Sequence, residues 1–307
     1  MSARHGRPGA ESRARDLRAT ADGGATVPRG AIHMKTAERD PARVRAHYEI
    51  ERSLAERLRR ASKQERRELY PALYDELMRR VDDHPLRHAV RSPEEIASSV
   101  AYHQNMLAPF LQPGSVFLEI GAGDCTLSLA VARGLKQVYA LDVSTETTAH
   151  VVPPPNVQVV ISDGTSIPVP AGSVDLAFSN QLMEHLHPDD ALEQLREIYT
   201  ALAPGGRYLC ATPNRLNGPH DISRGFDTTA TGLHLREYTV RELVPIMKRA
   251  GFKQVQVYYP SRHLCTSAAP VEVIEALLES LPSSLRWKLA SRDPLRQILN
   301  IRLVATK

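Results

Sequence analysis

Near the middle of the chain, a short apolar run leads into a glycine-containing turn and then a helical pattern: Leu118-Glu119-Ile120-Gly121-Ala122-Gly123-Asp124-Cys125-Thr126. Gly121 and Gly123 allow a tight turn and let a ligand approach the backbone closely. Asp142 ends the next apolar run, 19 residues after Gly123, at a position where a carboxylate can bind both hydroxyls of a ribose. Together the strand, turn, helix and acid predict a nucleoside-binding site.

Apolar runs and helical patterns alternate from residue 115 onward. The expected strands are 116–120, 137–141, 157–161, 174–179, 207–211, 254–259 and 298–305. Helices are expected at 125–134, 188–202 and 239–250, and Thr239-Val240-Arg241-Glu242 is a capping box that opens the last of them. This alternation predicts an α/β fold, with a parallel sheet and helices on both of its faces.

Three segments lie outside this alternation. Residues 1–33 hold six arginines against three acidic residues and almost no large apolar side chains, which predicts a disordered tail; an upstream extension before a start at Met34 is an equal alternative. Residues 34–111 predict a helical extension or cap, with helices at 40–61, 64–82 and 93–111. The remaining domain, 112–307, contains an insertion at 260–297 with an amphipathic helix near 270–281.

Charge and composition exclude several classes of protein. The 307 residues carry a net charge of +4, of which +3 lies in 1–33, so the rest of the chain is nearly neutral and lacks the basic face that nucleic acid needs. No apolar run approaches about 18 residues, which argues against a membrane span. The three cysteines are widely spaced and form no disulfide or metal pattern, which fits a reducing cytoplasm.

The residues around the glycine turn also bear on the type of nucleoside. A dinucleotide site would have a third glycine where Thr126 stands. The carboxylate of Glu119 would repel a pyrophosphate but attract the α-amino group of a methionine-type cofactor. This favours S-adenosylmethionine, and an NAD-type oxidoreductase remains the alternative.

Several segments resemble the motifs of class I S-adenosylmethionine-dependent methyltransferases. Residues 116–124 resemble their glycine-rich first motif and 138–144 their ribose-binding motif. Residues 160–175 resemble the adenine-binding segment of the small-molecule branch, the type 11 methyltransferase domain, and 176–185 and 202–206 resemble its fourth motif and the following turn. The resemblance covers about 100–260 and departs from the pattern at Cys125, where many members have a third glycine. It implies a Rossmann-like, mostly parallel sheet of seven strands with an antiparallel last strand, and S-adenosyl-L-methionine as cofactor.

The resemblance further implies a set of cofactor-binding residues near the carboxyl ends of the first four strands: Glu119, Gly121, Ala122, Gly123, Asp142, Val143, Ser162, Asp163, Gly164, Asn180 and Gln181. The first four would line the methionine part, Asp142 would hold the ribose, and Val143 would lie beside the adenine. Asp163, with Ser162 or Gly164, would reach the adenine amino group, and the last two would face the acceptor. Plain capping roles remain open for Asp142 and Asp163.

Three histidines on loops after the strands are candidates for the catalytic base: His185, His220 and His234. Methyl transfer from a sulfonium depends on alignment, and a neutral hydroxyl acceptor also needs a base within reach. Structural roles in these loops are the alternative. His187 is followed by Asp189 and Asp190, a pattern that indicates helix capping, so no metal site is expected.

The acceptor is the least determined feature. The fourth motif contains Ser179-Asn180-Gln181-Leu182, without the prolines and aromatic residue typical of enzymes that methylate base amino groups, and one Trp and five Phe leave few surfaces for base stacking. Polar loops suggest a hydroxyl of a small metabolite or a glycan, and no nucleic-acid or membrane partner. A protein or RNA methyltransferase recruited by the tail and a noncatalytic cofactor-binding protein remain alternatives, and the oligomeric state is undetermined.

Overall fold

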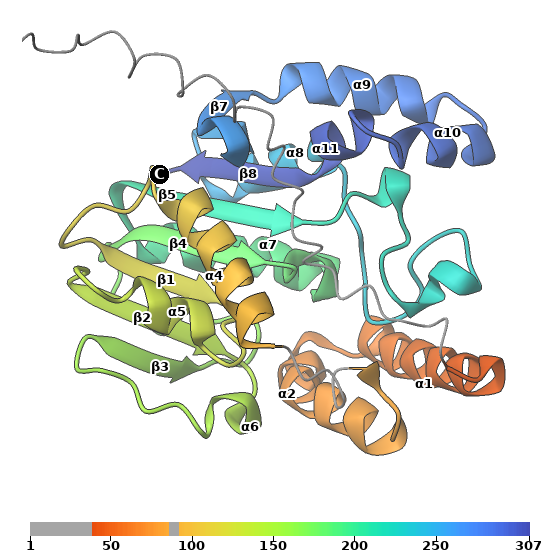
Figure 1. The fold of residues 1–307 in the computed structure, drawn as a ribbon, viewed down its shortest axis with the longest axis horizontal. Helices are drawn as coiled ribbons and strands as arrows, with labels where there is room; N and C mark the ends of the chain where they lie inside the picture. The colour runs from red at the N-terminus through yellow and green to blue at the C-terminus, as the bar shows by residue number, and fades with distance from the viewer. Residues whose placement is uncertain (1–38, 86–91) are drawn as a thin grey trace, which may run out of the picture. The chain divides into compact units, whose positions relative to one another are not determined.

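An eight-stranded sheet is the centre of the computed structural model, which describes residues 39–85 and 92–307 (Figure 1). The predicted tail 1–33 lies outside the described residues. The strands follow the order β3-β2-β1-β4-β5-β8-β6-β7. Their bounds are β1 (Val116–Ile120), β2 (Gln137–Asp142), β3 (Val157–Ile161), β4 (Val174–Asn180), β5 (Leu202–Thr212), β6 (Gln254–Tyr259), β7 (Leu264–Ser267) and β8 (Ile301–Thr306).

The strand directions confirm the predicted α/β class. The first five strands pair in parallel, and β8 lies antiparallel between β5 and β6. The sheet has one strand more than expected, because β7 pairs antiparallel with β6. Its four residues are too few to produce a recognisable alternating pattern. The last strand begins at Ile301 rather than at 298, because the preceding residues form a short helix.

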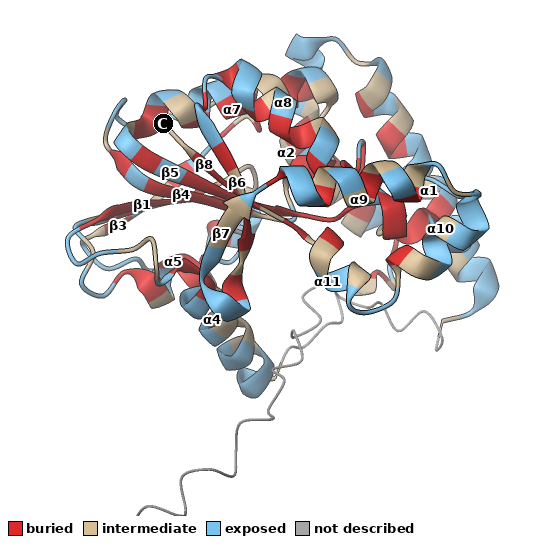
Figure 2. Cartoon of the chain, turned by 90° about the horizontal axis from the view of Figure 1, so that it is seen from above, coloured by how far each residue is buried: buried red, intermediate tan, exposed pale blue. Residues whose placement is uncertain are grey.

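Helices cover both faces of the sheet. They are α1 (Pro41–Arg60), α2 (Lys63–Arg80), α4 (Pro93–Leu107), α5 (Thr126–Val131), α6 (Thr145–Thr148), α7 (Pro188–Ala201), α8 (Val240–Ala250), α9 (Ala269–Glu279), α10 (Ser283–Ala290) and α11 (Leu295–Leu299). Short 3₁₀ turns are η2 (Met183–His185), η3 (Arg215–Asn217), η4 (Ile222–Gly225) and η5 (Pro260–Arg262). Figure 2 shows the buried sheet between α7 and α8 on one side and α4 and α5 on the other.

Local sequence signals account for where several helices begin. The predicted capping box of α8 is present, with the Thr239 side chain accepting from the Glu242 backbone and the Glu242 side chain accepting in return. Serine and glutamate form the same reciprocal pair at the starts of α2 and α4. Each box satisfies backbone N–H groups that the first helical turn leaves free.

The N-terminal helices pack beside the carboxyl ends of the central strands. Leu54 and Leu58 of α1 and Leu73 and Leu77 of α2 are buried in the same apolar cluster as Ile120 of β1. Residues 34–307 cluster as one compact unit. The helices therefore contribute to the main core and also border the edge of the sheet at which open α/β proteins bind ligands.

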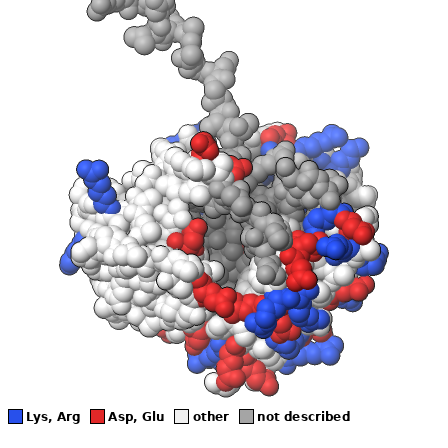
Figure 3. All heavy atoms as spheres, turned by 60° about the horizontal axis from the view of Figure 1, so that its bottom comes forward, with Lys and Arg blue, Asp and Glu red and all other residues white. Residues whose placement is uncertain are grey.

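Opposite charges are mixed on the surface of these helices. Arg57 pairs with Glu76, and Arg67 and Lys63 both pair with Glu193. Figure 3 shows basic and acidic side chains interspersed on one side of the face it displays, and few charges on the other described part of that face. In the described ranges, no helix combines the length and the hydropathy needed to cross a membrane.

Candidate active site

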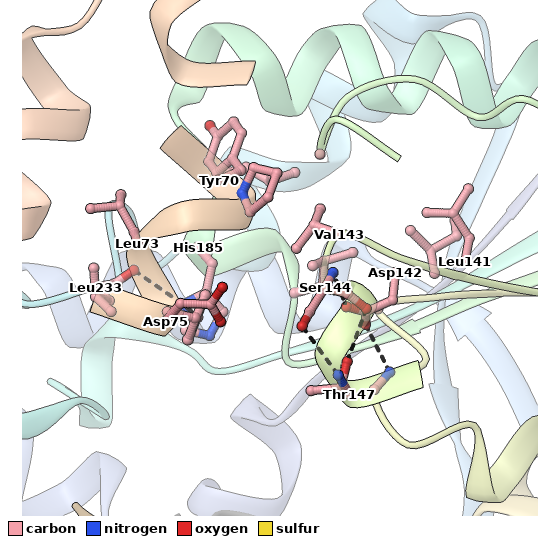
Figure 4. A pocket seen from close by; sticks show the side chains of 18 of the residues that line it. Tyr70, Leu73, Asp75, Leu141, Asp142, Val143, Ser144, Thr147, His185 and Leu233 are labelled. Atoms are coloured by element: carbon pink, nitrogen blue, oxygen red, sulfur yellow. Dashed lines mark hydrogen bonds between the residues drawn. The ribbon is translucent and has the colours of Figure 1, made fainter. Parts of the chain in front are cut away.

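A cavity of about 480 Å³ lies between α2 and the carboxyl ends of β1, β2 and β4 (Figure 4). This volume is typical of a small-molecule site. One wall includes Gly121, Gly123 and Asp142, and the opposite wall includes Tyr70 and Tyr74 of α2. The cavity is therefore bordered both by the predicted nucleoside-binding turn and by the N-terminal helices.

Left-handed backbone conformations shape the turn after β1. Gly121 and Gly123 have φ angles of 76° and 53°, which favour glycine. Cys125, at the position of the departure from the family pattern, also has a positive φ of 58° and is fully buried. Its backbone N–H donates to the carbonyl of Ala122 at 2.9 Å, so the turn is closed by a hydrogen bond at this position.

Asp142 connects the turn to the cavity. One carboxylate oxygen accepts from the Gly123 N–H at 2.8 Å, and the other accepts from the Ser144 N–H at 2.9 Å. Each oxygen can accept a further hydrogen bond, and the side chain lines the cavity next to Val143. Asp142 thus holds the turn and the start of the next segment while it lines the cavity; the N-cap of the following helix α6 is Ser144.

Glu119 lies behind the turn and does not line the cavity. Its side chain is buried and accepts a hydrogen bond from the hydroxyl of Ser128 in α5 at 2.6 Å. Burial raises the pKa of Glu119 to about 7, an effect that the hydrogen bond from Ser128 partly opposes. The carboxyl group can therefore change its charge near neutral pH.

The expected adenine-binding segment is only partly at the cavity. Gly164 lines it, whereas the Asp163 carboxylate accepts from the backbone N–H groups of Thr165 and Ser166 and lies 3.3 Å from Arg67. Burial tends to raise the pKa of Asp163, but these hydrogen bonds lower it to about 2. The capping role expected as the alternative for Asp163 is therefore present in the structure.

Of the other candidate cofactor-binding residues, some line the cavity and others do not. The hydroxyl of Ser162 accepts from the Gly164 N–H at 3.1 Å and donates to the carbonyl of Ser166. Gln181, directly after β4, lines the cavity and has a positive φ of 54°, which is unusual for a residue with a side chain. Asn180 and Ala122 are outside the cavity lining.

His185 is the histidine that the structure places at the cavity. Its Nδ1 lies 3.0 Å from the Tyr74 hydroxyl and 3.1 Å from the Leu233 carbonyl. Because a carbonyl only accepts, we place the proton on Nδ1, which leaves Nε2 with a free lone pair. Burial, together with the neighbouring His234, lowers the pKa of His185 to about 3, so the ring is neutral.

His220 and His234 lie outside the cavity lining. The Nε2 atom of His220 lies 3.1 Å from the Asn214 carbonyl and 2.9 Å from the side-chain oxygen of Asn217. Among the hydrogen bonds of the described residues, none joins its ring to the adjacent Asp221. His234 is buried, and its Nδ1 lies 2.7 Å from a carboxylate oxygen of Glu237.

The segment after His185 has the expected capping role. His187 is the N-cap of α7, and its ring nitrogen accepts from the Asp189 N–H at 3.3 Å. Asp190 instead forms a buried ion pair with Arg66 of α2, with an Nε–Oδ2 distance of 2.6 Å. Asp190 is therefore engaged in packing α2 against α7.

The residues that α2 contributes to the cavity were not among those expected at the site. They follow one another at helical spacing: Tyr70, Pro71, Leu73, Tyr74, Asp75 and Met78. Tyr70 lies so close to Gly164 that a Cβ atom on that glycine would be 2.7 Å from the tyrosine ring. The apolar stripe of this helix was visible in the sequence, but a stripe that packs on a core and one that lines a cavity have the same spacing.

Comparisons with known proteins agree with the geometry. Residues 118–210 match the family described as a methyltransferase domain. A protein of Mycolicibacterium smegmatis named "Probable S-adenosylmethionine-dependent methyltransferase" is 33% identical over 141 residues, which is 46% of this chain and 52% of the relative. A Mycobacterium tuberculosis protein with the same description is 33% identical over 139 residues, or 45% of this chain and 48% of the relative. The chain thus spans about half the length of the curated relatives that it matches.

A solved structure to which the chain is similar is phospholethanolamine N-methyltransferase 2 of Haemonchus contortus, in complex with phosphomonomethylethanolamine and S-adenosylhomocysteine. It is 22% identical, with a TM-score of 0.46, over 67% of this chain and 52% of that chain.

Proposed function

From the premise that residues 118–210 are a class I S-adenosylmethionine-dependent methyltransferase domain, we propose that the whole chain methylates a hydroxyl group of a small metabolite. The observation that carries this proposal is the cavity, which the glycine turn and Asp142 border on one side and His185 and α2 on the other. A nucleoside cofactor and a second small molecule can meet there.

The cofactor supplies a methyl group that is already activated. The acceptor oxygen forms a bond to the methyl carbon while the carbon–sulfur bond breaks, the bonding electron pair goes to sulfur, and the proton of the acceptor hydroxyl passes to water. Alignment of the two molecules therefore contributes much of the rate. In our proposal the turn at Gly121 and Gly123 receives the methionine part, and Asp142 accepts the ribose hydroxyls.

The walls of the cavity favour a metabolite over a glycan as acceptor. Leu58, Leu73 and Met78 from the N-terminal helices line the cavity, as do Leu186 and Leu233 from the loops. A glycan would leave its hydroxyls without partners against such walls, at an energetic cost. A hydroxyl on a largely apolar molecule fits them better.

We assign the contact with the acceptor to His185, because it is the one candidate histidine in the cavity lining. Tyr74 and Leu233 fix its ring through Nδ1. We expect His185→Ala to lower turnover at least tenfold without changing the affinity for S-adenosylhomocysteine. His150→Ala, which removes an exposed histidine, is the matched control and keeps full turnover.

Two measurements test the function itself. Calorimetry compares S-adenosylhomocysteine with NAD, and we expect saturable binding of the first alone. Labelled methyl transfer from S-adenosylmethionine into extract fractions then identifies the product. Transfer to a protein, an RNA or an amine would refute the proposed acceptor, and NAD binding without S-adenosylhomocysteine binding would refute the cofactor.

A further inference from the structure

Behind the wall formed by His185, three side chains place potential metal-binding atoms close together. They are Glu184 and His185 of η2 and His234 of the loop before α8, and one ligand atom from each lies within 4.8 Å of those of the other two. In sequence the first two are 49 or more residues from the third. No sequence motif predicts that these three side chains are neighbours, because only the folded chain brings them together.

The three side chains lie close together without bonding to one another. In the part of the chain that the structure describes, no hydrogen bond or ion pair joins Glu184 to either histidine, and the two imidazole rings meet edge to face at 4.8 Å between centroids. The Glu184 side chain is fully buried, and its Oε1 atom has no hydrogen-bond partner. A buried, unpaired carboxylate oxygen is costly, and a bound cation would remove that cost.

The remaining atoms of these side chains are held as metal-binding side chains usually are. Nδ1 of His185 lies against the Leu233 carbonyl, and Nδ1 of His234 lies 2.7 Å from a Glu237 carboxylate oxygen. The other carboxylate oxygen of Glu184 accepts from the Thr212 hydroxyl at 2.8 Å. Such outer partners fix the ring orientation and leave Nε2 of each histidine free to bind an ion.

A second histidine–glutamate group, in the N-terminal helices, lacks these properties. His47, Glu51 and His84 also lie within 4.8 Å of one another. However, Nε2 of His47 is already 2.8 Å from Glu51, and its Nδ1 is 3.0 Å from the guanidinium of Arg39. The Arg39 cation would repel a metal ion, and the ligand atoms of His47 are already in use.

We propose that Glu184, His185 and His234 bind one divalent transition-metal ion of the zinc, cobalt or manganese type. Two imidazole nitrogens and one carboxylate oxygen are a donor set that suits these ions better than magnesium or calcium. Ligand atoms about 2.0–2.2 Å from an ion lie about 3.4 Å apart, so the side chains must move inward by about 1 Å when the ion binds.

The position of the ion suggests a role for it in the proposed methyl transfer. This one step of the inference rests on the proposed function. Three protein ligands leave the ion with an open position, and His185 also lines the cavity. The acceptor oxygen would occupy that position, and the ion would favour loss of its proton. Contact between His185 and the acceptor then runs through the ion.

Metal binding to the full chain, without cofactor or acceptor, tests the site. We expect equilibrium dialysis to give one tightly bound Zn²⁺ or Co²⁺ per chain, with Co²⁺ showing visible absorption bands typical of mixed nitrogen and oxygen ligands. Glu184→Gln and His234→Gln should each weaken binding at least about 100-fold, the upper end of what losing an outer partner costs. His47→Gln, the matched control in the second group, should leave it unchanged.

A measurement on the unaltered protein covers the case in which a variant fails to fold. One equivalent of Zn²⁺, which is diamagnetic, should shift the imidazole Nε2 signals of His185 and His234, which bind the ion, but not those of His47. Absence of saturable binding at millimolar Zn²⁺, or loss of binding in His47→Gln instead, would overturn the metal site. Either result would leave S-adenosylhomocysteine binding and methyl transfer untouched, so the proposed function would stand or fall by its own experiments.

Discussion

Asp142 combines two tasks in one side chain. Its carboxylate holds the glycine turn through the N–H of Gly123 and starts the next segment through the N–H of Ser144, and in our proposal it also accepts the ribose hydroxyls. Hydrogen bonds to a charged group contribute about 1.5–3 kcal/mol each. We therefore expect Asp142→Ala to reduce the affinity for S-adenosylhomocysteine at least 100-fold by calorimetry, and Asp142→Asn to have an intermediate effect.

Asp175 provides the matched control for Asp142. Its carboxylate accepts from the Val116 N–H at 2.8 Å, at the start of β1, which is the opposite end of the strand from the cavity. Asp175→Ala should lower the stability of the fold while the folded protein keeps its affinity. Equal loss of affinity in both variants would mean that Asp142 acts only through the backbone.

We expect Glu119, which is buried behind the glycine turn, to make cofactor binding depend on pH. Its pKa in the folded protein, about 7, lies above the ordinary value of 4.5. The contribution of Glu119 to stability is thus complete below about pH 4.5 and is lost as the pH rises through about 7. A ligand ammonium group nearby favours the ionised form, so below pH 7 binding must release the proton.

We accordingly expect the affinity for S-adenosylhomocysteine to rise by up to about tenfold per pH unit between about 5.5 and 7. Calorimetry in two buffers of different ionisation enthalpy would detect the released proton. Glu119→Gln keeps the shape of the side chain and should give a flat profile. A wild-type profile that is equally flat would show that the Glu119 charge does not act on the ligand.

At this site, the residues that could be predicted from the sequence are those whose role depends on backbone conformation alone. Gly121 and Gly123 announced a turn that the structure contains, because few other residues tolerate a positive φ. The adenine segment was harder, because Asp163 has the same sequence neighbours whether it binds a ligand or caps a turn. The proximity of Glu184, His185 and His234 could not be predicted, since only the folding of the loops brings these residues together.

A buried ion pair with α7 contributes to the position of α2. The Arg66 guanidinium makes two hydrogen bonds to the Asp190 carboxylate, at 2.6 and 2.7 Å, and the Tyr70 hydroxyl donates to the same group at 2.7 Å. Removing one partner leaves a buried charge, which typically costs 3–5 kcal/mol. We predict a loss of about this size in the free energy of unfolding for Arg66→Met, measured by urea denaturation.

The exposed pair Arg57–Glu76, which joins α1 to α2 at 2.8 Å, is the comparison for this effect. Arg57→Met should cost less than about 1 kcal/mol, as surface pairs do. The double variant Arg66→Met with Asp190→Leu should regain most of the stability lost in Arg66→Met. A loss as small as that of Arg57→Met would show that α2 is held by its apolar contacts alone.

Elements with strong local signals were the ones that could be predicted. The ends of α2, α4 and α8 lie within a few residues of those expected, because capping boxes and apolar stripes are properties of neighbouring residues. The strand β7 and the helix α11 were missed because each has only four or five residues. The cavity beside α2 could not be predicted either. The apolar stripe of this helix indicates that it packs against other residues but does not identify them.

The distribution of net charge along the chain predicts which part of the protein binds nucleic acid. Residues 1–33 carry a net +3 of the total +4, whereas the described helices pair their arginines with acidic neighbours. Binding to polyanions requires an uncompensated positive charge, and its salt dependence reports how many phosphates are contacted. Any attraction to nucleic acid should therefore come from the tail.

We predict that the full chain binds a fluorescent DNA duplex weakly, with an affinity that falls as KCl rises. Because the tail has six arginines, the log–log salt slope should be no steeper than about −5. A chain of residues 34–307, which form one compact unit, should show no binding by anisotropy while it retains S-adenosylhomocysteine affinity. Equal DNA binding by both chains would place the basic surface within 34–307 and would favour an RNA acceptor over the metabolite proposed here.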